Sequence, residues 1–298
     1  MTTDETLVKP KVKIKVFGVG GGGNSVLMRM GQHNELDIEL YAVNTDAKQL
    51  QITAQVGGVN CIQIGENLTR GRGTGGNIQI GEQAAKNDAA KLQAAMNGAD
   101  LVFVTAGMGG GTGTGAAPIV ARLAKEMGIL SVGVVTVPFA FEGNRKKKVA
   151  QEGITKMQSQ MDALIAVEND NLSKLPENRK MSLVKAFECA DNILKQAINC
   201  VAELILTTGV INVDFADVTT IFRQSESSDA LLGIGVSERS AVDAVKIAAE
   251  SPLIDKGLTG ARGIILNLTG DSTLSLYDVD EATRYIVKHT DPEVNIIL

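Results

Sequence analysis

Along the first 170 residues, short apolar segments typical of buried strands alternate with segments whose apolar residues recur at helical spacing. The strand-like segments are KIKVFGV, IELYAVNTD, NCIQIG, DLVFVTAG, ILSVGVVTVP and MDALIAVEND. This alternation predicts an α/β fold, a Rossmann-like doubly wound parallel sheet with helices on both faces. Because such sheets bind ligands at the carboxyl ends of their strands, we expect a site in the loops that follow the strands.

Two of the predicted helices carry clear end signals. Residues 81–100, GEQAAKNDAAKLQAAMNGAD, are predicted to form one helix with Gly98 as its C-terminal stop. In AAPIVARLAKEMG, residues 116–128, Pro118 suits the first helical turn and Gly128 suits the end.

A long apolar segment at residues 181–207 divides the chain. Its apolar positions keep a helical period over about seven turns, which predicts a central, packed helix. Residues 12–180 are then expected to form the sheet domain, and residues 208–298 a smaller α+β domain. In that second domain the strands GIILNLTG and EVNIIL accompany the helices ERSAVDAVKIAAES and VDEATRYIVKHT. Residues 1–11 are polar and expected to be disordered.

Composition argues against several classes of function. The net charge of -5 is unlike that of a general nucleic-acid or anionic-membrane binder. Cys61, Cys189 and Cys200 fit no zinc spacing and no disulfide framework, so we expect small buried residues of a reducing compartment. Two histidines argue against a histidine metal site or a catalytic triad. With no secretory h-region and no apolar run of about 18 residues, a cytoplasmic protein is expected.

Three glycine-rich segments point to an anion site. GVGGGGN, residues 18–24, satisfies G-x-G-x-x-G, which by itself fits a dinucleotide site or a tight strand-to-helix turn. GRGTGGN, residues 71–77, and GMGGGTGTGAAP, residues 107–118, add two more, and Thr112 and Thr114 can supply hydroxyl donors. No G-x-x-x-x-G-K-[ST] occurs, which excludes a P-loop NTPase. Backbone N–H groups of three such loops suit several phosphates, so a nucleoside triphosphate is predicted.

The segment GGGTGTG, residues 109–115, is similar to the signature of the tubulin/FtsZ GTPases. Seven further segments occur in that family's order, namely GVGGGGN, AVNTDA, TRGRGTGGN, GVVTVPFAFEG, END, AFECADN and GVINVDFADV. The chain resembles the family from about residue 12 to residue 298. The expected fold is therefore a GTP-binding domain over residues 12–180, a central helix and a C-terminal domain that begins with a catalytic loop.

The resemblance implies a site for GTP or GDP. Residues at the nucleotide-binding positions would be Gly20, Gly21, Gly22, Gly23, Asn24, Ser25, Asn44, Asp46, Gly73, Thr74, Gly75, Gly109, Gly110, Gly111, Thr112, Gly113 and Thr114, of which all but Asn44 and Asp46 lie in the three expected phosphate loops. Glu142 would bind the ribose, Asn169 and Asp191 would read guanine, Phe187 would stack on the base, and Lys146 stands at a nucleotide-contacting position. Taken in isolation, the spacing of Phe187 and Asp191 fits a core residue and an ordinary polar residue of a packed helix better than it fits a nucleotide site. Mg²⁺ would be held mainly through phosphates and water, with no protein ligand set.

The segment NVDFAD, residues 212–217, carries the expected catalytic residues Asn212, Asp214 and Asp217. Asp214 by itself would also suit a helix N-cap. In the family the matching loop acts in trans, on the nucleotide of the next subunit, where the two carboxylates would polarise and position the attacking water. A head-to-tail contact does not close, so it builds filaments. The resemblance thus implies a self-assembling GTPase of bacterial cell division, located at the division site.

Some positions depart from the family pattern. Lys146 stands where an arginine is usual, Asn144 where a basic residue is common, Glu168 replaces a proline and Asn171 an arginine. The sequence ends at Leu298 without the family's linker and tether-binding tail, which leaves open a trimmed chain or a naturally short one. The expected partners are copies of itself and other division proteins, with no nucleic acid and no direct membrane contact.

Two other hypotheses remain open at this point. A paralogue that binds GTP and forms or modulates filaments with little hydrolysis would share all these segments. A dinucleotide-dependent oxidoreductase rests on residues 18–23 alone and leaves the other two glycine loops without a role.

Overall fold

The computed structural model describes residues 11–32, 34–174, 181–207, 213–224, 227–254 and 257–298. Its centre is a seven-stranded sheet in the order β3-β2-β1-β4-β5-β6-β7 in which every pairing is parallel. The strands are β1 (Ile14–Val19), β2 (Ile38–Asn44), β3 (Val59–Gln63), β4 (Leu101–Gly107), β5 (Leu130–Val137), β6 (Ala163–Glu168) and β7 (Asp229–Ala230). Strand order reverses between β1 and β4, which makes their carboxyl ends the topological switch point of the sheet.

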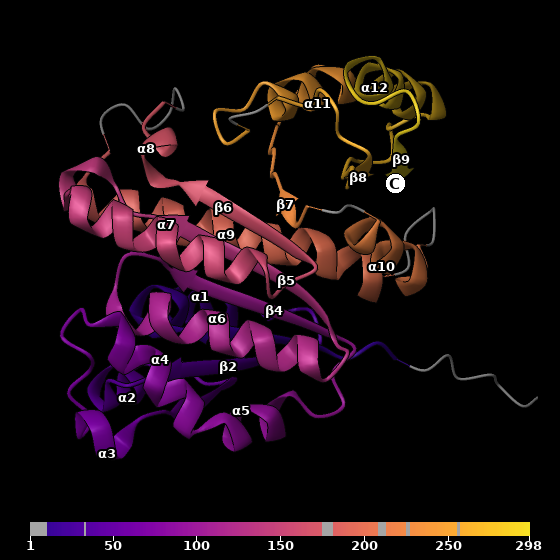
Figure 1. Ribbon diagram of the computed structural model, residues 1–298. Coiled ribbons are helices and arrows are strands. Elements are labelled where there is room, and N and C mark those ends of the chain that lie inside the picture. Colours follow the sequence, from indigo (N-terminus) through magenta and orange to yellow (C-terminus); the bar gives the residue numbers. More distant parts are fainter. Residues whose placement is uncertain (1–10, 33, 175–180, 208–212, 225–226, 255–256) are drawn as a thin grey trace, which may run out of the picture.

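Helices cover both faces of this sheet (Figure 1). One face carries α1 (Gly20–Gly31), α2 (Ala47–Ala54) and α9 (Leu183–Leu206), and the other carries α4 (Ile78–Asn87), α5 (Ala89–Met96), α6 (Gly111–Glu126) and α7 (Asn144–Gln158). Alternate strand residues point to opposite cores: Leu101 and Phe103 to the first, Val102 and Val104 to the second. Short helices α3 (Glu66–Thr69), η1 (Ala140–Glu142) and α8 (Asn169–Leu172) lie in the connections. The predicted doubly wound α/β fold is confirmed.

Two helix boundaries differ from the prediction. Helix α6 begins at Gly111, so Pro118 lies inside it and not in its first turn. The predicted single helix at residues 81–100 is two helices, because Asp88 leaves helical geometry and its Oδ2 accepts a hydrogen bond from the Gly65 amide at 2.7 Å. Gly98 follows the second helix with a positive φ of 73°, as a stop signal should.

The central helix α9 was predicted and spans 24 residues. The elements after it are α10 (Phe215–Arg223), β7, α11 (Ala241–Ala249), β8 (Gly263–Ile265), α12 (Leu276–His289) and β9 (Asn295–Ile297). Helix α11 and the two strands β8 and β9 are shorter than predicted, whereas α12 begins earlier and is longer. Strands β8 and β9 pair in parallel, and α11 and α12 form a small core of Val245, Ala282 and Ile286 with them. Helix α10 instead buries Val218 and Ile221 in the main core.

Three smaller expectations can be compared with the structure. Cys61 is exposed, and Cys189 and Cys200 are partly buried, so the expectation of three buried cysteines is wrong. Residues 1–10 of the predicted disordered N-terminus lie outside the described residues. Within the described part of the chain, no helix is both long and apolar enough to cross a membrane.

Candidate nucleotide site

The loops after β1 and β4 meet at the switch point of the sheet, backbone against backbone. A β-carbon at Gly20 would lie 2.7 Å from the Gly113 amide nitrogen, and one at Gly22 would lie 2.9 Å from the Gly107 nitrogen. Real β-carbons do not approach other atoms this closely, so both positions require glycine. Each loop runs directly into a helix, α1 or α6, whose first turns are made of these same residues.

The third glycine loop, at residues 71–77, packs against the loop after β4 and is bonded to Thr45 after β2. A β-carbon at Gly111 would lie 2.0 Å from Thr74 Oγ1. Thr112 Oγ1 lies 2.8 Å from Thr45 Oγ1, and the Gly73 amide donates to the Thr45 carbonyl at 3.4 Å. The predicted phosphate loops therefore form one continuous floor at the carboxyl edge of the sheet.

Gly110 differs from its neighbours in this floor. Its φ of -88° is open to any residue, and a β-carbon there would have no protein atom within 4 Å. Gly21 is similar, because a β-carbon there would meet only the flexible end of the Gln49 side chain, at 3.1 Å. Neither backbone geometry nor protein packing requires glycine at Gly110, which fits a position kept clear for a ligand. Gly75 also faces open space, although its φ of 61° already favours glycine.

The buried polar side chains of the floor bind one another. Asn24 Nδ2 donates to the Gly18 carbonyl at 2.8 Å, and Asn24 Oδ1 accepts from Asn44 Nδ2 at 2.7 Å. Asn44 Oδ1 in turn accepts from the Asp46 amide, and Asp46 caps α2. Thr114 Oγ1 accepts from the Gly109 amide at 2.8 Å. These four predicted site residues hold the loops in shape, and Ser25 lies half-buried in α1 beside them.

One wall of the site is the loop after β5, which includes η1. Glu142 binds with both carboxylate oxygens, accepting from the Phe139 amide at 3.1 Å and from Lys146 Nζ at 3.0 Å. Phe139 and Phe141 stack at 5.1 Å between centroids, and Phe187 of α9 meets both edge-on. Phe187 is 40% exposed, so it is not the core residue that its helical spacing alone would suggest.

Asn169 lies beside this wall, at the carboxyl end of β6. It is 4% exposed, and its Oδ1 has no hydrogen-bond partner in the structure. Next to it, Asp170 accepts from the Ala140 amide at 2.8 Å and from Lys147 Nζ, which ties α8 to η1. Burial would raise the pKa of Asp170, but the hydrogen bonds from Lys147 and Ala140 outweigh it and lower the pKa. A buried acceptor without a partner is costly unless a ligand or water satisfies it.

Asp191 lies one helical turn beyond Phe187 on α9. Its Oδ2 accepts from Arg29 Nε of α1 at 3.2 Å, and burial raises the pKa of its carboxyl in spite of that cation. Sequence reasoning assigned no role to Arg29, Phe139, Phe141, Lys147 or Asp170, although Phe139, Phe141 and Asp170 lie in segments that carry the family resemblance. Their roles follow only from the packing of separate elements.

The predicted catalytic carboxylates lie at the opposite edge of the sheet. Asp214 occupies the N-cap position of α10 without a capping hydrogen bond from its side chain, and Asp217 follows in the first turn; both are exposed. Helix α9 separates them from Phe187 and Asp191 and is about 36 Å long at 1.5 Å per residue. The structure therefore does not bring them to the glycine loops of the same chain (Figure 1). Asn212 lies outside the described residues.

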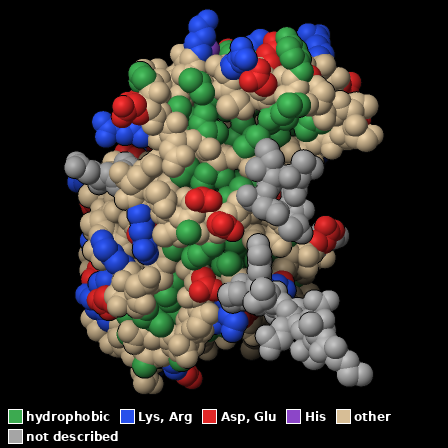
Figure 2. Space-filling view, turned by 90° about the vertical axis from the view of Figure 1, so that its right-hand side faces the viewer, with side chains coloured by type: hydrophobic (Ala, Val, Ile, Leu, Met, Phe, Trp, Pro, Cys, Tyr) green, Lys and Arg blue, Asp and Glu red, His purple; other side chains and the backbone are tan. Residues whose placement is uncertain are grey.

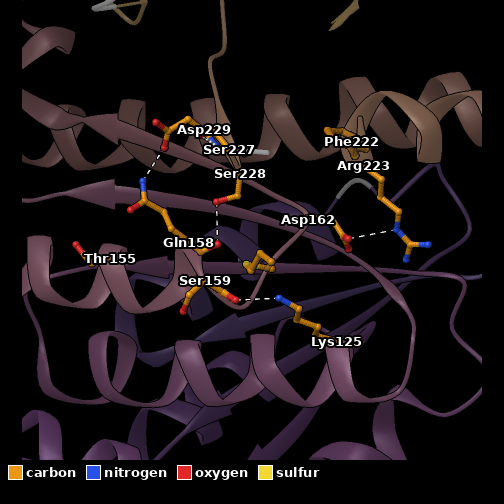
Figure 3. A pocket seen from close by; sticks show the side chains of 11 residues that line it. Lys125, Thr155, Gln158, Ser159, Asp162, Phe222, Arg223, Ser227, Ser228 and Asp229 are labelled. Atoms are coloured by element: carbon orange, nitrogen blue, oxygen red, sulfur yellow. Dashed lines mark hydrogen bonds and ion pairs between the residues drawn. The ribbon is translucent and has the colours of Figure 1, made fainter. Parts of the chain in front are cut away.

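Two other features bear on the assignment. A cavity of about 620 Å³ lies between α7 and α10, far from the glycine loops, and includes Lys125, Asp162 and Arg223 in its lining (Figure 3). Among the described residues, no three His, Cys, Asp or Glu side chains are grouped so that they could hold a metal ion.

The fold and the floor define a class of α/β protein in which glycine-rich loops meet at the switch point of a parallel sheet and no P-loop lysine is present. The family model described as Tubulin/FtsZ family, GTPase domain, matches residues 13–177, and that of the FtsZ family C-terminal domain matches residues 228–298. An empty FtsZ dimer from M. jannaschii is similar with a TM-score of 0.88 and 40% identity, over 98% of this chain and 83% of that one. A mutant FtsZ of M. jannaschii is similar with a TM-score of 0.86 and 40% identity, over 96% of this chain and 85% of that one.

The GTPγS-bound protofilament of CetZ2 from Haloferax volcanii shares the fold, with a TM-score of 0.74 and 23% identity over 96% of this chain and 88% of that one. The chain belongs to the tubulin/FtsZ family and carries its GTPase domain.

Proposed function

We propose that this protein is a self-assembling GTPase that polymerises head-to-tail and hydrolyses GTP between subunits, in the cytoplasm, at the bacterial division site. Residues 12–180 would bind the nucleotide, and residues 208–298 would supply the catalytic loop at their start. The observation that carries the proposal is the backbone contact among three glycine loops at the switch point, because this floor offers several phosphates N–H groups without a lysine.

The phosphates would lie on this floor, against the N-termini of α1 and α6. Both helices begin within the glycine loops, so their positive dipole ends and unpaired amides face the same space. Gly110 leaves room there for the ligand. Mg²⁺, bound through the phosphates and water, would offset their charge.

The base would lie by Phe187 and Asn169. Guanine offers N1–H and N2–H donors, and the unpartnered Oδ1 of Asn169 and the carboxylate of Asp191 are acceptors. Glu142 would accept from the ribose hydroxyls, in competition with Lys146. The fit of a buried acceptor that has no protein partner supports a base with N–H donors at this position.

Hydrolysis would need a neighbouring subunit. Water would attack the γ-phosphorus while the bond to the β–γ bridging oxygen breaks, and Asp214 and Asp217 of the neighbour would accept hydrogen bonds from that water and so orient it. Their exposure at the edge opposite the nucleotide supports an action in trans, because α9 keeps them from the site in their own chain.

The face that carries α10 also exposes apolar side chains, which gather between the C-terminal elements and the sheet domain (Figure 2). Exposed large apolar residues of the C-terminal part include Val236, Leu276 and Tyr277. An apolar surface of this kind supports a protein contact. A contact between two different faces repeats without closing and yields a filament.

GTP turnover and pelleting as functions of protein concentration test the proposal. We expect turnover per molecule to rise cooperatively with concentration, and Asp214→Ala to bind GTP and assemble while hydrolysing very slowly. Turnover per molecule that stays flat across concentration would contradict hydrolysis in trans.

A second candidate is a GTP-binding filament protein with little hydrolysis. The ion pair between Lys146 and Glu142 favours it, because it engages two groups that would otherwise serve the nucleotide. GTP-dependent filaments without turnover in the same assay would establish this alternative.

A further inference from the structure

Helix α10 carries both proposed catalytic carboxylates at its N-terminal end. Asp214 occupies the N-cap position and Asp217 the first turn, so both move with the helix as a rigid body. The direction in which they project from the subunit is therefore set by the contacts that fix the orientation of α10.

The apolar contacts of α10 fix one of its faces. Val218 and Ile221, three residues apart, are buried in the main core, and Phe222 packs partly against it. Apolar contact is non-directional, and at its C-terminal end the helix lines the cavity of about 620 Å³ between α7 and α10 with Phe222 and Arg223. A directional contact at this end would therefore add a fixed orientation to what apolar packing provides.

A directional contact is present at this end. Arg223, the last residue of α10, donates from Nε to Asp162 Oδ1 at 3.2 Å (Figure 3). The other oxygen of Asp162 accepts from the Ser131 amide at 2.8 Å and from Ser131 Oγ at 3.1 Å. Ser131 belongs to β5 and Asp162 immediately precedes β6, so Arg223 is bound to a carboxylate that the central sheet holds in place.

The segment after α10 is tied to the sheet domain as well. Ser228 Oγ donates to the Gln158 carbonyl at 2.8 Å, and Gln158 Nε2 donates to Asp229 Oδ1 at 2.6 Å. Both bonds join the end of α7 to the start of β7, as Figure 3 shows. These bonds fix the chain beyond α10, whereas the pair of Arg223 and Asp162 fixes the helix itself.

We propose that Arg223 is a positioning residue for hydrolysis in the neighbouring subunit: by binding Asp162 it fixes the tilt of α10 and thereby aims Asp214 and Asp217 at the neighbour's nucleotide. The inference rests on the proposed function, since it presumes hydrolysis in trans. It predicts that loss of Arg223 affects catalysis without affecting the subunit's own nucleotide site, which is at the other end of α9.

The test compares Arg223→Gln with Arg223→Lys, which keeps the charge. Arg284→Gln, which removes an exposed ion pair with Asp280 on α12, is the matched control. We expect Arg223→Gln to retain GTP affinity, thermal midpoint and the amount of polymer formed with a slowly hydrolysed GTP analogue. Its turnover per polymerised subunit should fall about tenfold, since small misplacements of reacting groups have effects of this size or more. Arg223→Lys should retain most of the activity and Arg284→Gln all of it.

A mixing experiment shows in which subunit the defect acts. Gly110→Ala subunits, at a GTP concentration too low to fill their sites, still present a normal α10. Arg223→Gln subunits have an intact nucleotide site, so a mixture of the two variants should turn over more GTP than the two variants do separately. A mixture of Gly110→Ala with Asp214→Ala should behave in the same way.

If Asp214→Ala is complemented and Arg223→Gln is not, the role of Arg223 is refuted and hydrolysis in trans stands. If neither is complemented, hydrolysis in trans is itself refuted. Unchanged turnover in Arg223→Gln, or a loss explained by less polymer, would also overturn the inference.

Discussion

Single residues of the glycine loops have two different reasons to be glycine. Gly20, Gly22 and Gly111 would each place a β-carbon within 3 Å of another loop, and Gly113 would place one within 3 Å of Gly107 in its own loop, so the fold itself requires them. Gly110 meets no protein atom and has an ordinary φ. A count of glycines in the sequence cannot separate these two kinds, because the contacts that distinguish them come from loops distant in the chain.

Replacing Gly110 by alanine should separate folding from binding. A β-carbon fits there without strain, so the free energy of unfolding should stay the same or rise by about 0.5 kcal/mol through the restricted unfolded chain. GTP affinity should fall about tenfold, because the methyl group enters the space assigned to the phosphates. Thermal unfolding and equilibrium binding check the two effects.

Gly113→Ala is the matched control for this variant. Its β-carbon would lie 2.7 Å from the Gly107 carbonyl oxygen, so it should lower the thermal midpoint. Full GTP affinity in Gly110→Ala would show that the ligand does not occupy this space.

The Oδ1 atom of Asn169, which has no hydrogen-bond partner, leads to a second prediction. Asn169→Ala removes a buried acceptor that has no protein partner, so the stability of the nucleotide-free protein should not fall. GTP affinity should fall at least tenfold, roughly the effect of losing one buried hydrogen bond to the ligand. The measurement is the rise in thermal midpoint that GTP causes, which should shrink in the variant.

Asn171→Ala serves as its control. Asn171 is also buried, but its Oδ1 already accepts from Lys174 Nζ at 2.6 Å. This variant should lose stability and keep its response to GTP, and the reverse pattern in the two variants would contradict the assignment of Asn169.

Among elements, the long periodic ones were predictable and their junctions were not. Strand β4 and helix α9 follow from apolar pattern alone. The break between α4 and α5 does not, because Asp88 leaves the helix to bind Gly65, a residue 23 positions away. Likewise α6 starts at Gly111 because its glycines pack on α4: a β-carbon at Gly115 would lie 2.2 Å from the Ile78 carbonyl oxygen. Tertiary contact overrides local signals at both places.

Asp88 should make the junction of α4 and α5 sensitive to pH. Burial would raise the pKa of its carboxyl, but Lys91 and the Gly65 amide together lower it below its ordinary 3.8. A lowered carboxyl pKa stabilises the folded state above about pH 4, and the stabilisation is lost as pH falls through the lowered value. Asp88→Asn should therefore lower the free energy of unfolding at pH 7 by about 1 kcal/mol, which is measured as a lower urea midpoint.

The difference in stability between Asp88→Asn and the original protein should shrink as pH falls below about 4 and through the lowered pKa of Asp88. A difference that is constant with pH would mean that the charge of Asp88 is not what holds the junction.

In the molecule as a whole, α9 places the two halves of the proposed active site at opposite ends. The sequence order of its segments predicted both halves, since each matches the family locally. Their separation is a property of the folded chain: Phe187 lies near the start of α9 and Asp214 caps α10, which Figure 1 shows beyond the other end of α9. Under the proposed function, a subunit built in this way would have a complete site only where two copies meet.

Such an assembly should be sensitive to small amounts of a subunit that is blocked at one face. Ala216 is exposed on α10 between the two carboxylates, so Ala216→Arg adds bulk to the face that carries α10 without altering the nucleotide site. The variant should bind GTP normally and attach through its other face, ending the filament it joins. With one variant in ten subunits, mean filament length should fall to about ten subunits, because each blocked copy terminates a non-closing chain.

Electron microscopy of mixed filaments measures this effect, with Arg284→Gln as a control for a surface change on α12. If filament length stays unchanged and polymer mass falls only by the one tenth that the variant contributes, the contact between subunits does not lie at α10. Capping at one variant in ten would locate it at α10 and link assembly and hydrolysis to the same surface.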